Sequence, residues 1–308
     1  MHNHSKHYKV LSLTGGGYRG YYTVSVLSAL EELGQFKIRD KCDLYAGTSI
    51  GGIIALGLAA GLTSEKIKQG FKNNGTNIFP NSFRRNWLNL IWCKYNSKNL
   101  KQAIINILGT GVCGLKISKL SRPVLVTSIC LEDGETCLIS SVDPKYNEWN
   151  VLDAALATSA APTYFSSHQV KGSTYVDGGL SCNVPDIAVL SFILDKLKKD
   201  IDAIQMLSIG TLHNTHKTTS YKNTRKSAGV LVWGKRLTDV IIDSQRNIIL
   251  NQCKQLLPVE RYLRIDRQIE HAPDLDVVNE SLQSDFAEYA KCDAREAYKK
   301  AFLKSFIH

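Results

Sequence analysis

Two adjacent segments of the chain repeat one pattern: a short apolar run, a glycine-rich turn, and then apolar residues at helical spacing. In the first segment, Tyr8–Leu13 is followed by three glycines and by a helical pattern that stops at Gly34. In the second, residues 42–46 lead through another glycine turn into an Ala/Leu/Ile-rich helix that ends at Gly61. Consecutive strand–turn–helix units need crossover connections, so they predict an α/β fold with a central, mainly parallel sheet flanked by helices.

Strand and helix signals continue to the end of the chain. We expect strands at 122–130, 136–141, 204–209 and 262–265, and helices beginning at Ser97 and covering 151–159, 185–198 and much of 225–257 and 279–306. The 308 residues contain no linker and no internal repeat. A single domain over 1–308 is therefore expected, in which residues 188–308 form a C-terminal part that is a candidate for regulation.

The second glycine turn, Gly47-Thr48-Ser49-Ile50-Gly51, fits the pattern G-x-S-x-G between a strand and a helix. A sharp turn there exposes the serine hydroxyl, and only glycine tolerates the crowding on both sides. The helix N-terminus also favours a developing anion beside Ser49. The pattern alone is equally typical of a small-residue turn that packs a helix onto a sheet.

The first turn, Gly15-Gly16-Gly17-Tyr18-Arg19-Gly20, offers backbone amides to an anion, and two kinds of anion fit. It matches G-x-G-x-x-G, which in dinucleotide-binding proteins is followed about 20 residues later by an acid that binds the ribose. Asp40 and Asp43 lie near that distance. Alternatively, the amides form an oxyanion hole for a carbonyl attacked by Ser49, to which Arg19 would add positive charge.

A serine nucleophile needs a base within hydrogen-bond reach. His213, His216 and His271 lie in polar loops and are expected to be solvated, as is the terminal His308, and His168 precedes the best acid instead of following it. That acid is Asp177, in Tyr175-Val176-Asp177-Gly178-Gly179, just after a short β-like run. Two glycines let another backbone approach closely, so Asp177 can take the serine proton directly, although an ordinary Asp-Gly turn has the same sequence.

Together, these segments resemble the patatin-like phospholipase family. Residues 15–20 resemble its oxyanion loop, 47–51 its nucleophile elbow, 177–179 its Asp-Gly-Gly element, and 158–165 a segment shortly before that aspartate. The four matches occur in the family order within residues 10–187. Four ordered matches are far more specific than any one of them.

The resemblance implies a patatin-like three-layer fold and a lipid acyl hydrolase of the phospholipase A type that needs no cofactor and no metal. Its catalytic dyad would be Ser49 and Asp177, without a histidine. The remaining site residues implied are the oxyanion group Gly15, Gly16, Gly17 and Arg19, and the motif glycines Gly47, Gly51, Gly178 and Gly179. The chain is also similar to compact bacterial members that act in antiphage defence, which implies activation by a cyclic dinucleotide and self-association on activation.

The segment 79–95 carries aromatic and aliphatic residues interleaved with Arg84, Arg85 and Lys94, a mixture that suits a membrane interface. A capping segment packed on the domain has the same composition. Lys and Arg number 38 against 28 acidic residues, for a net charge of +10, so we expect negatively charged partners such as phospholipid or a cyclic dinucleotide. Basic clusters at 221–226 and 225–236 are candidates for the nucleotide, although solvated basic faces look the same.

Other features exclude several classes. Eight cysteines without a C-x-x-C pair indicate reduced thiols in a cytoplasmic protein, and no DNA or RNA partner is expected. The longest strongly apolar stretch, 50–62, is shorter than the about 20 residues that a spanning helix needs. No run of oxygen ligands indicates calcium. Two rival interpretations remain, namely an oxidoreductase that uses Gly15-x-Gly17-x-x-Gly20 and a non-catalytic protein that binds lipids or anions.

Overall fold

The computed structural model describes residues 7–78, 93–214 and 230–307. In that part of the chain, eight strands form one sheet in the order β5-β6-β3-β2-β1-β7-β9, with β4 paired to β3. The strands are β1 (Tyr8–Leu13), β2 (Leu44–Thr48), β3 (Val124–Cys130), β4 (Thr136–Ser140), β5 (His168–Val170), β6 (Ser173–Asp177), β7 (Ile204–Ile209) and β9 (Tyr262–Ile265). The five strands from β3 to β9 run parallel, whereas β4, β5 and β6 add antiparallel pairs at one side.

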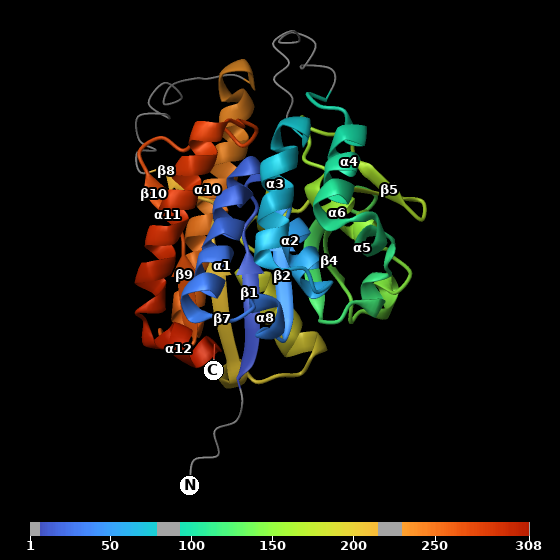
Figure 1. The fold of residues 1–308 in the computed structure, drawn as a ribbon. Coiled ribbons are helices and arrows are strands. Elements are labelled where there is room, and N and C mark those ends of the chain that lie inside the picture. The colour runs from blue at the N-terminus through green and yellow to red at the C-terminus, as the bar shows by residue number, and fades with distance from the viewer. Residues whose placement is uncertain (1–6, 79–92, 215–229, 308) are drawn as a thin grey trace.

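Helices cover both faces of this sheet (Figure 1). Their bounds are α1 (Gly20–Gly34), α2 (Ile50–Ala59), α3 (Ser64–Ile78), α4 (Ser97–Leu108), α5 (Thr110–Gly114), α6 (Val151–Ser159), α7 (Gly179–Cys182), α8 (Asp186–Lys196), α10 (Val230–Leu256), α11 (Glu280–Tyr298) and α12 (Ala301–Ile307). A small parallel pair, β8 (His213–Asn214) and β10 (Gln268–Ile269), lies beside the main sheet.

Two hydrophobic clusters show how the layers form. Successive residues of a strand point to opposite faces, and Leu11 and Tyr45 pack into the larger cluster with α1, α2, α3, α6 and α11. Their neighbours Val10 and Leu44 pack into the second cluster, with α8 and the end of α10. Because both faces are buried, the parallel strands carry nearly continuous apolar runs, which explains why the sequence pattern located them. The predicted three-layer α/β arrangement is confirmed.

The parallel topology brings the ends of β1 and β2 side by side. Ser12 pairs with Ala46 and Leu13 with Gly47, so the two glycine turns leave the sheet at the same edge. The strand predicted at 42–46 begins two residues later than expected, because Asp43 still belongs to the preceding turn and its carboxylate accepts the backbone N–H of Lys9 at 2.8 Å. The helix α3, which the sequence interpretation did not predict, packs against α1 and α4.

Candidate active site

Ser49 lies at a sharp turn between β2 and α2, with φ 54° and ψ −124°. A positive φ is strained for a residue other than glycine, and such strain persists where the surroundings enforce it. The flanking glycines show why the turn can form. A Cβ on Gly47 would lie 2.3 Å from the backbone of Gly51, and a Cβ on Gly51 would lie 2.4 Å from the carbonyl oxygen of Leu13. The strand-to-helix elbow therefore depends on both glycines.

The backbone of Ser49 is held by the end of α6. Its N–H donates to Thr158 Oγ1 at 2.9 Å, and the Thr158 hydroxyl donates onward to the carbonyl oxygen of Thr127 at 2.6 Å. Thr158 is buried and begins the 158–165 segment that the sequence comparison singled out. This segment thus has a role at the site, since it fixes the residue that carries the hydroxyl.

Asp177 lies at the end of β6, where its partner across the sheet is Ser128 of β3. Its N–H donates to the carbonyl oxygen of Ala160 at 3.0 Å, so the same 158–165 segment also anchors the aspartate. One carboxylate oxygen accepts the N–H of Gly179 at 2.7 Å, and the Ser49 side chain lies near enough to lower the pKa of this carboxylate. Ser49 and Asp177, which are 128 positions apart in sequence, are therefore neighbours in the fold.

The environment of Asp177 makes it a stronger base than an exposed carboxylate. Burial raises the pKa of Asp177 from 3.8 to about 6, and the hydrogen bonds from Ser49 and Gly179 offset only part of that effect. Asp177 is buried, with only 5% of its surface exposed. A carboxylate with a pKa near 6 is still ionised at neutral pH, and it accepts a proton more readily than an ordinary aspartate.

The first glycine turn lies against Ser49. A Cβ on Gly15 would be 3.3 Å from the Ser49 Cβ. The Gly15 N–H donates to the carbonyl oxygen of Asn183 at 3.0 Å, and the Gly15 carbonyl accepts from Thr211 Oγ1 at 3.0 Å and from Asn183 Nδ2 at 3.4 Å. The Gly15 amide is therefore engaged, in contrast to its expected role as an oxyanion donor. Among the described residues, the amides of Gly16 and Gly17 have no acceptor.

Arg19 points toward the C-terminal part of the chain. Its Nε donates to the carbonyl oxygen of Pro273 at 2.7 Å, and its Nη1 lies 3.5 Å from that of Leu212. The guanidinium therefore connects the glycine turn to two loops that follow β7 and β10. The expected role of Arg19, to add positive charge at the oxyanion, stays a prediction.

The histidines in the described ranges do not hydrogen-bond to Ser49 or Asp177. His168, on β5, contacts the Asp153 carboxylate at 3.2 Å, and His271 is exposed. His216 and His308 lie outside the described residues. His213 was expected to be solvated, and this was wrong. Its side chain is 16% exposed and lies 3.5 Å from the Asp266 carboxylate, because the 210–214 segment packs against the end of β9.

The ribose-binding acid required by the oxidoreductase interpretation has no support. The Asp43 carboxylate is occupied by the Lys9 N–H, and the Asp40 side chain is 63% exposed in a turn before β2. Within the residues that the structure describes, no group of three potential metal ligands comes together, and no helix is long and apolar enough to cross a membrane.

The segment 79–95 is only partly described. Residues 79–92 lie outside the described ranges, so neither the membrane interpretation nor the capping interpretation is tested there. Lys94 and Tyr95 are described, and Tyr95 is buried and donates to Asp276 at 2.7 Å. The last two residues of the segment are therefore attached to the domain.

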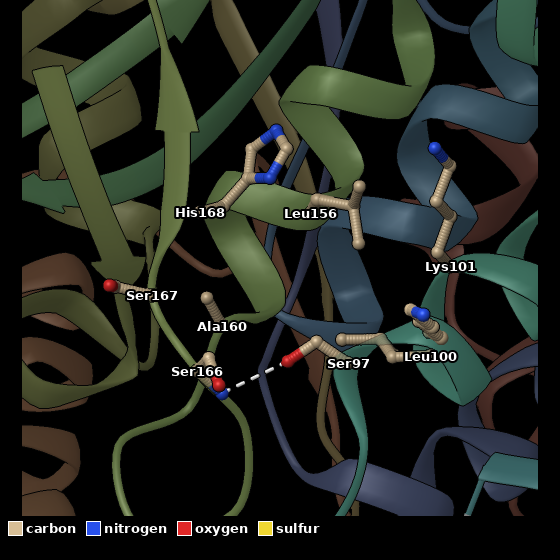
Figure 2. Close-up of a pocket in the computed structure, with 9 residues that line it drawn as sticks. Ser97, Leu100, Lys101, Leu156, Ala160, Ser166, Ser167 and His168 are labelled. Carbon is tan, nitrogen blue, oxygen red and sulfur yellow. Dashed lines mark hydrogen bonds between the residues drawn. The ribbon is translucent and has the colours of Figure 1, made fainter. Parts of the chain in front are cut away.

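A cavity of about 240 Å³ lies beside α6, and its lining does not include the predicted site residues (Figure 2). The residues that line it are Ser97, Lys98, Leu100, Lys101, Leu156, Ala160, Ser166, Ser167 and His168. The Ser166 N–H donates to Ser97 Oγ at 3.0 Å across one end. Ala160 connects this cavity to the site, because its carbonyl oxygen accepts the N–H of Asp177.

Asn183 and Thr211 are site residues that the sequence interpretation missed. Asn183 follows the Asp-Gly-Gly element by four residues, and this position was a signal that could have drawn attention to it. Nothing in the sequence marks Thr211, since only the pairing of β1 with β7 brings it to the first glycine turn.

Comparisons with known proteins agree with this arrangement. The sequence model of the patatin-like phospholipase family matches residues 11–188. The chain is 32% identical to a cGAMP-activated phospholipase of Escherichia coli (strain TW11681) over 306 residues, covering 89% of this chain and 84% of that protein. It is 30% identical to a cGAMP-activated phospholipase of Vibrio cholerae over 310 residues, covering 90% and 86% of the two chains.

Among solved structures, VipD from Legionella pneumophila has a similar fold, with a TM-score of 0.53 and 15% sequence identity over 94% of this chain and 66% of that one. The family match spans both glycine turns and the Asp-Gly-Gly element, and it includes the Ser49–Asp177 pair. The chain therefore belongs to the patatin-like phospholipase family.

Proposed function

We propose that this protein is a phospholipase of the A type, which cleaves acyl esters of membrane glycerophospholipids with Ser49 as nucleophile and Asp177 as base. One observation carries the proposal: the buried Asp177 carboxylate lies so near the Ser49 side chain at the elbow that Ser49 lowers its pKa against the effect of burial. The first glycine turn supports the proposal too, because Gly15 lies against Ser49 and the amides of the next two residues, Gly16 and Gly17, have no acceptor among the described residues.

In the first half of the reaction, Asp177 takes the proton of the Ser49 hydroxyl while Ser49 Oγ attacks the ester carbonyl carbon. The carbonyl oxygen becomes an oxyanion, which accepts the N–H groups of Gly16 and Gly17. Such donors are already oriented, and loss of one typically costs about 10²- to 10³-fold in turnover. When the intermediate collapses, the C–O bond to the glycerol breaks and Asp177 returns its proton to the lysophospholipid oxygen.

The second half regenerates the enzyme. Asp177, again ionised, removes a proton from water, and the hydroxide attacks the acyl-serine carbonyl. The Ser49 oxygen leaves with the proton held by Asp177, and a fatty acid is released. One carboxylate serves both halves, which is consistent with the absence of a histidine contact to the dyad in the described residues.

The proposal extends to regulation. The two relatives are named as cGAMP-activated phospholipases and match about nine-tenths of this chain, so we propose that cGAMP or a related cyclic dinucleotide activates this protein in antiphage defence. The net charge of +10 supports an anionic activator and an anionic lipid surface. We further propose that the protein works from the cytoplasm at the inner face of the membrane, with contact through 79–95 and self-association on activation.

The same proposal treats residues 1–308 as one catalytic domain. Its support is that β7 and β9, from the C-terminal part, extend the sheet that carries Ser49.

The test is release of fatty acid from phospholipid vesicles by the wild type, Ser49→Ala and Asp177→Asn, each with and without cGAMP. Ser166→Ala is a matched control, since Ser166 is exposed and its hydroxyl contacts Cys93 instead of the dyad. We expect cGAMP-dependent release by wild type and Ser166→Ala and none by the dyad variants. Equal release with and without cGAMP would overturn the regulatory part, and release by Ser49→Ala would overturn the mechanism. A third result, no release by wild type with any cyclic dinucleotide, would favour the non-catalytic interpretation.

A further inference from the structure

The loop 273–276, far outside the family match, contacts three consecutive residues of the oxyanion turn. The carbonyl oxygen of Leu275 accepts the Tyr18 N–H at 2.7 Å, and that of Pro273 accepts Arg19 Nε at 2.7 Å. Gly17 has φ +54°, and a Cβ there would lie 2.3 Å from the Leu275 oxygen. The turn that offers the Gly16 and Gly17 amides is therefore closely packed against this loop.

Asp276, the last residue of this loop, anchors it to the rest of the domain. Its carboxylate accepts hydrogen bonds from Lys94 Nζ and, at 2.7 Å, from the Tyr95 hydroxyl. The Asp276 side chain is only 7% exposed. Burial alone would raise the pKa of Asp276, but the hydrogen bonds from Lys94 and Tyr95 hold it below its ordinary value, so the group stays ionised.

Lys94 and Tyr95 are in turn fixed to the segment that holds the dyad. Their N–H groups donate to the carbonyl oxygens of Thr163 and Tyr164 at 2.8 Å each. The Lys94 ammonium also lies 5.9 Å from the centre of the Tyr164 ring. The 158–165 segment also anchors Ser49 and Asp177. The loop 273–276 and the dyad are therefore attached to the same segment.

We infer that Asp276 is a positioning residue for the reaction, because it holds the loop 273–276 against residues 17–19 and thereby sets the Gly16 and Gly17 amides beside Ser49. This inference rests on the proposed function. Asp276 touches neither substrate nor dyad, so its contribution is to the geometry of the oxyanion hole. An oxyanion forms only in the transition state, hence loss of Asp276 should lower kcat and leave KM nearly unchanged.

The chain offers a closely matched control for the key variant. Asp274 lies two residues away in the same loop and is exposed, and its carbonyl oxygen accepts the Val277 N–H at 3.2 Å. Asp276→Asn and Asp274→Asn make the same chemical change in the same loop. Only the first weakens the anchor to Lys94 and Tyr95.

Two measurements on the full-length protein test the inference. With a soluble p-nitrophenyl ester and cGAMP present, we expect Asp276→Asn to lower kcat about 10- to 100-fold, a part of the loss of a whole oxyanion donor, with KM within about twofold. Asp274→Asn should match the wild type, and Tyr95→Phe, which removes one hydrogen bond, should lower kcat less than Asp276→Asn. In hydrogen exchange, the peptide covering 14–20 should exchange faster in Asp276→Asn than in Asp274→Asn, while peptides from β1 and β2 remain unchanged.

The inference and the proposed function can fail separately. If Ser49→Ala is inactive but Asp276→Asn and Asp274→Asn have the same kcat and the same exchange at 14–20, the function stands and the inference is wrong. If Asp276→Asn changes KM alone, the inference is also wrong. If Ser49→Ala retains activity, the proposed function is wrong, and the exchange comparison still decides whether Asp276 holds the turn. Should Asp276→Asn not fold, Tyr95→Phe decides in its place.

Discussion

The two glycine turns start from neighbouring parallel strands and open into helices, yet they are held in different ways. The elbow at Ser49 is fixed by contacts within the family-matched part of the chain, through Gly51, Thr158 and Thr127. The oxyanion turn is also held from outside that part, by Thr211 and the loop 273–276, in addition to its contacts with Asn183 and Ser49 inside the match.

This difference separates two properties of the site. The nucleophile follows β2, a central strand whose two faces are both packed. The backbone at this position has few alternative conformations that would keep the sheet intact. The oxyanion donors are positioned by loops, and loops belong to the less stable parts of a protein. A change in the C-terminal part can therefore alter the oxyanion hole and leave the dyad intact, so regulation is expected to act on the oxyanion turn.

The largest effect is expected at the elbow itself. Gly47→Ala places a Cβ 2.3 Å from the Gly51 backbone, which cannot move because Gly51 packs on Leu13. We expect loss of measurable esterase activity and a clear decrease in unfolding temperature, measured by calorimetry. Gly111→Ala is the control, since no atom lies within 4 Å of its added methyl group. A stable, active Gly47→Ala variant would contradict the assigned elbow.

A smaller effect is expected from Gly17→Ala in the oxyanion turn. The strained φ of +54° and the clash with the Leu275 oxygen should displace the turn, but the loop 273–276 can yield. We expect kcat to fall about 10²-fold, as for loss of one oxyanion donor, with a smaller change in unfolding temperature than for Gly47→Ala. If the two glycine variants lose equal stability, the distinction between a rigid elbow and an adjustable turn is wrong.

The pH profile separates the two turns in another way. Since Asp177 must be ionised to act as base and its pKa is about 6, kcat/KM should be level above pH 7 and decrease toward tenfold per pH unit well below pH 6. Gly17→Ala should lower the whole profile without moving its midpoint, because it leaves the surroundings of Asp177 unchanged. Initial rates across a constant-ionic-strength buffer series measure this. A midpoint near 4 would mean that burial does not affect Asp177.

A more modest loss should follow from Thr211→Val. The substitution preserves shape against Gly16 but removes the hydrogen bond to the Gly15 carbonyl, which Asn183 Nδ2 still reaches at 3.4 Å. A neutral hydrogen bond contributes about 0.5–1.5 kcal/mol, so kcat should fall about two- to tenfold. Thr211→Ser keeps the hydroxyl and should retain more activity than the valine variant. The reverse order would show that packing on Gly16 matters more than the hydrogen bond.

The last expected effect concerns stability instead of activity, and it arises at the dyad. Because the folded protein binds the Asp177 proton more tightly than the unfolded chain, stability decreases as pH rises from about 4 to about 6 and stays lower above that. The raised pKa corresponds to a cost of at most about 3 kcal/mol at pH 8. Asp177→Asn should therefore unfold at a higher temperature than wild type at pH 8, with the advantage shrinking toward pH 4. A lower unfolding temperature at pH 8 would contradict the burial cost.

The sequence predicted those features that depend on short-range pattern. The apolar runs of β1, β3, β7 and β9 and the glycine turns are local signals, and the long amphipathic segment became α11. What it could not predict were contacts made by topology. Gly15 was expected to donate to the oxyanion, but its N–H bonds to the carbonyl oxygen of Asn183, and this pairing exists only because the fold brings the residue after α7 to the turn after β1.

Arg19 and His213 illustrate the same limit. Arg19 follows a glycine turn, and its charge suggested an anion, whereas the carbonyl of Pro273 from 254 positions away receives its Nε. His213 occurs in a polar stretch, which suggested a solvated loop, but Asp266 at the end of the last parallel strand attracts it into the structure. Both side chains have partners that only long-range strand order supplies.

The most direct test of the account is covalent labelling of the nucleophile. An alkyl fluorophosphonate forms a stable bond to an activated serine, and peptide mass spectrometry locates the adduct. We expect one adduct on Ser49 in wild type, no adduct on Ser49→Ala, and much slower labelling of Asp177→Asn, with Asp153→Asn, a change on the neighbouring helix α6, as control. An adduct on another serine, or labelling of Asp177→Asn at the wild-type rate, would contradict the Ser49–Asp177 dyad.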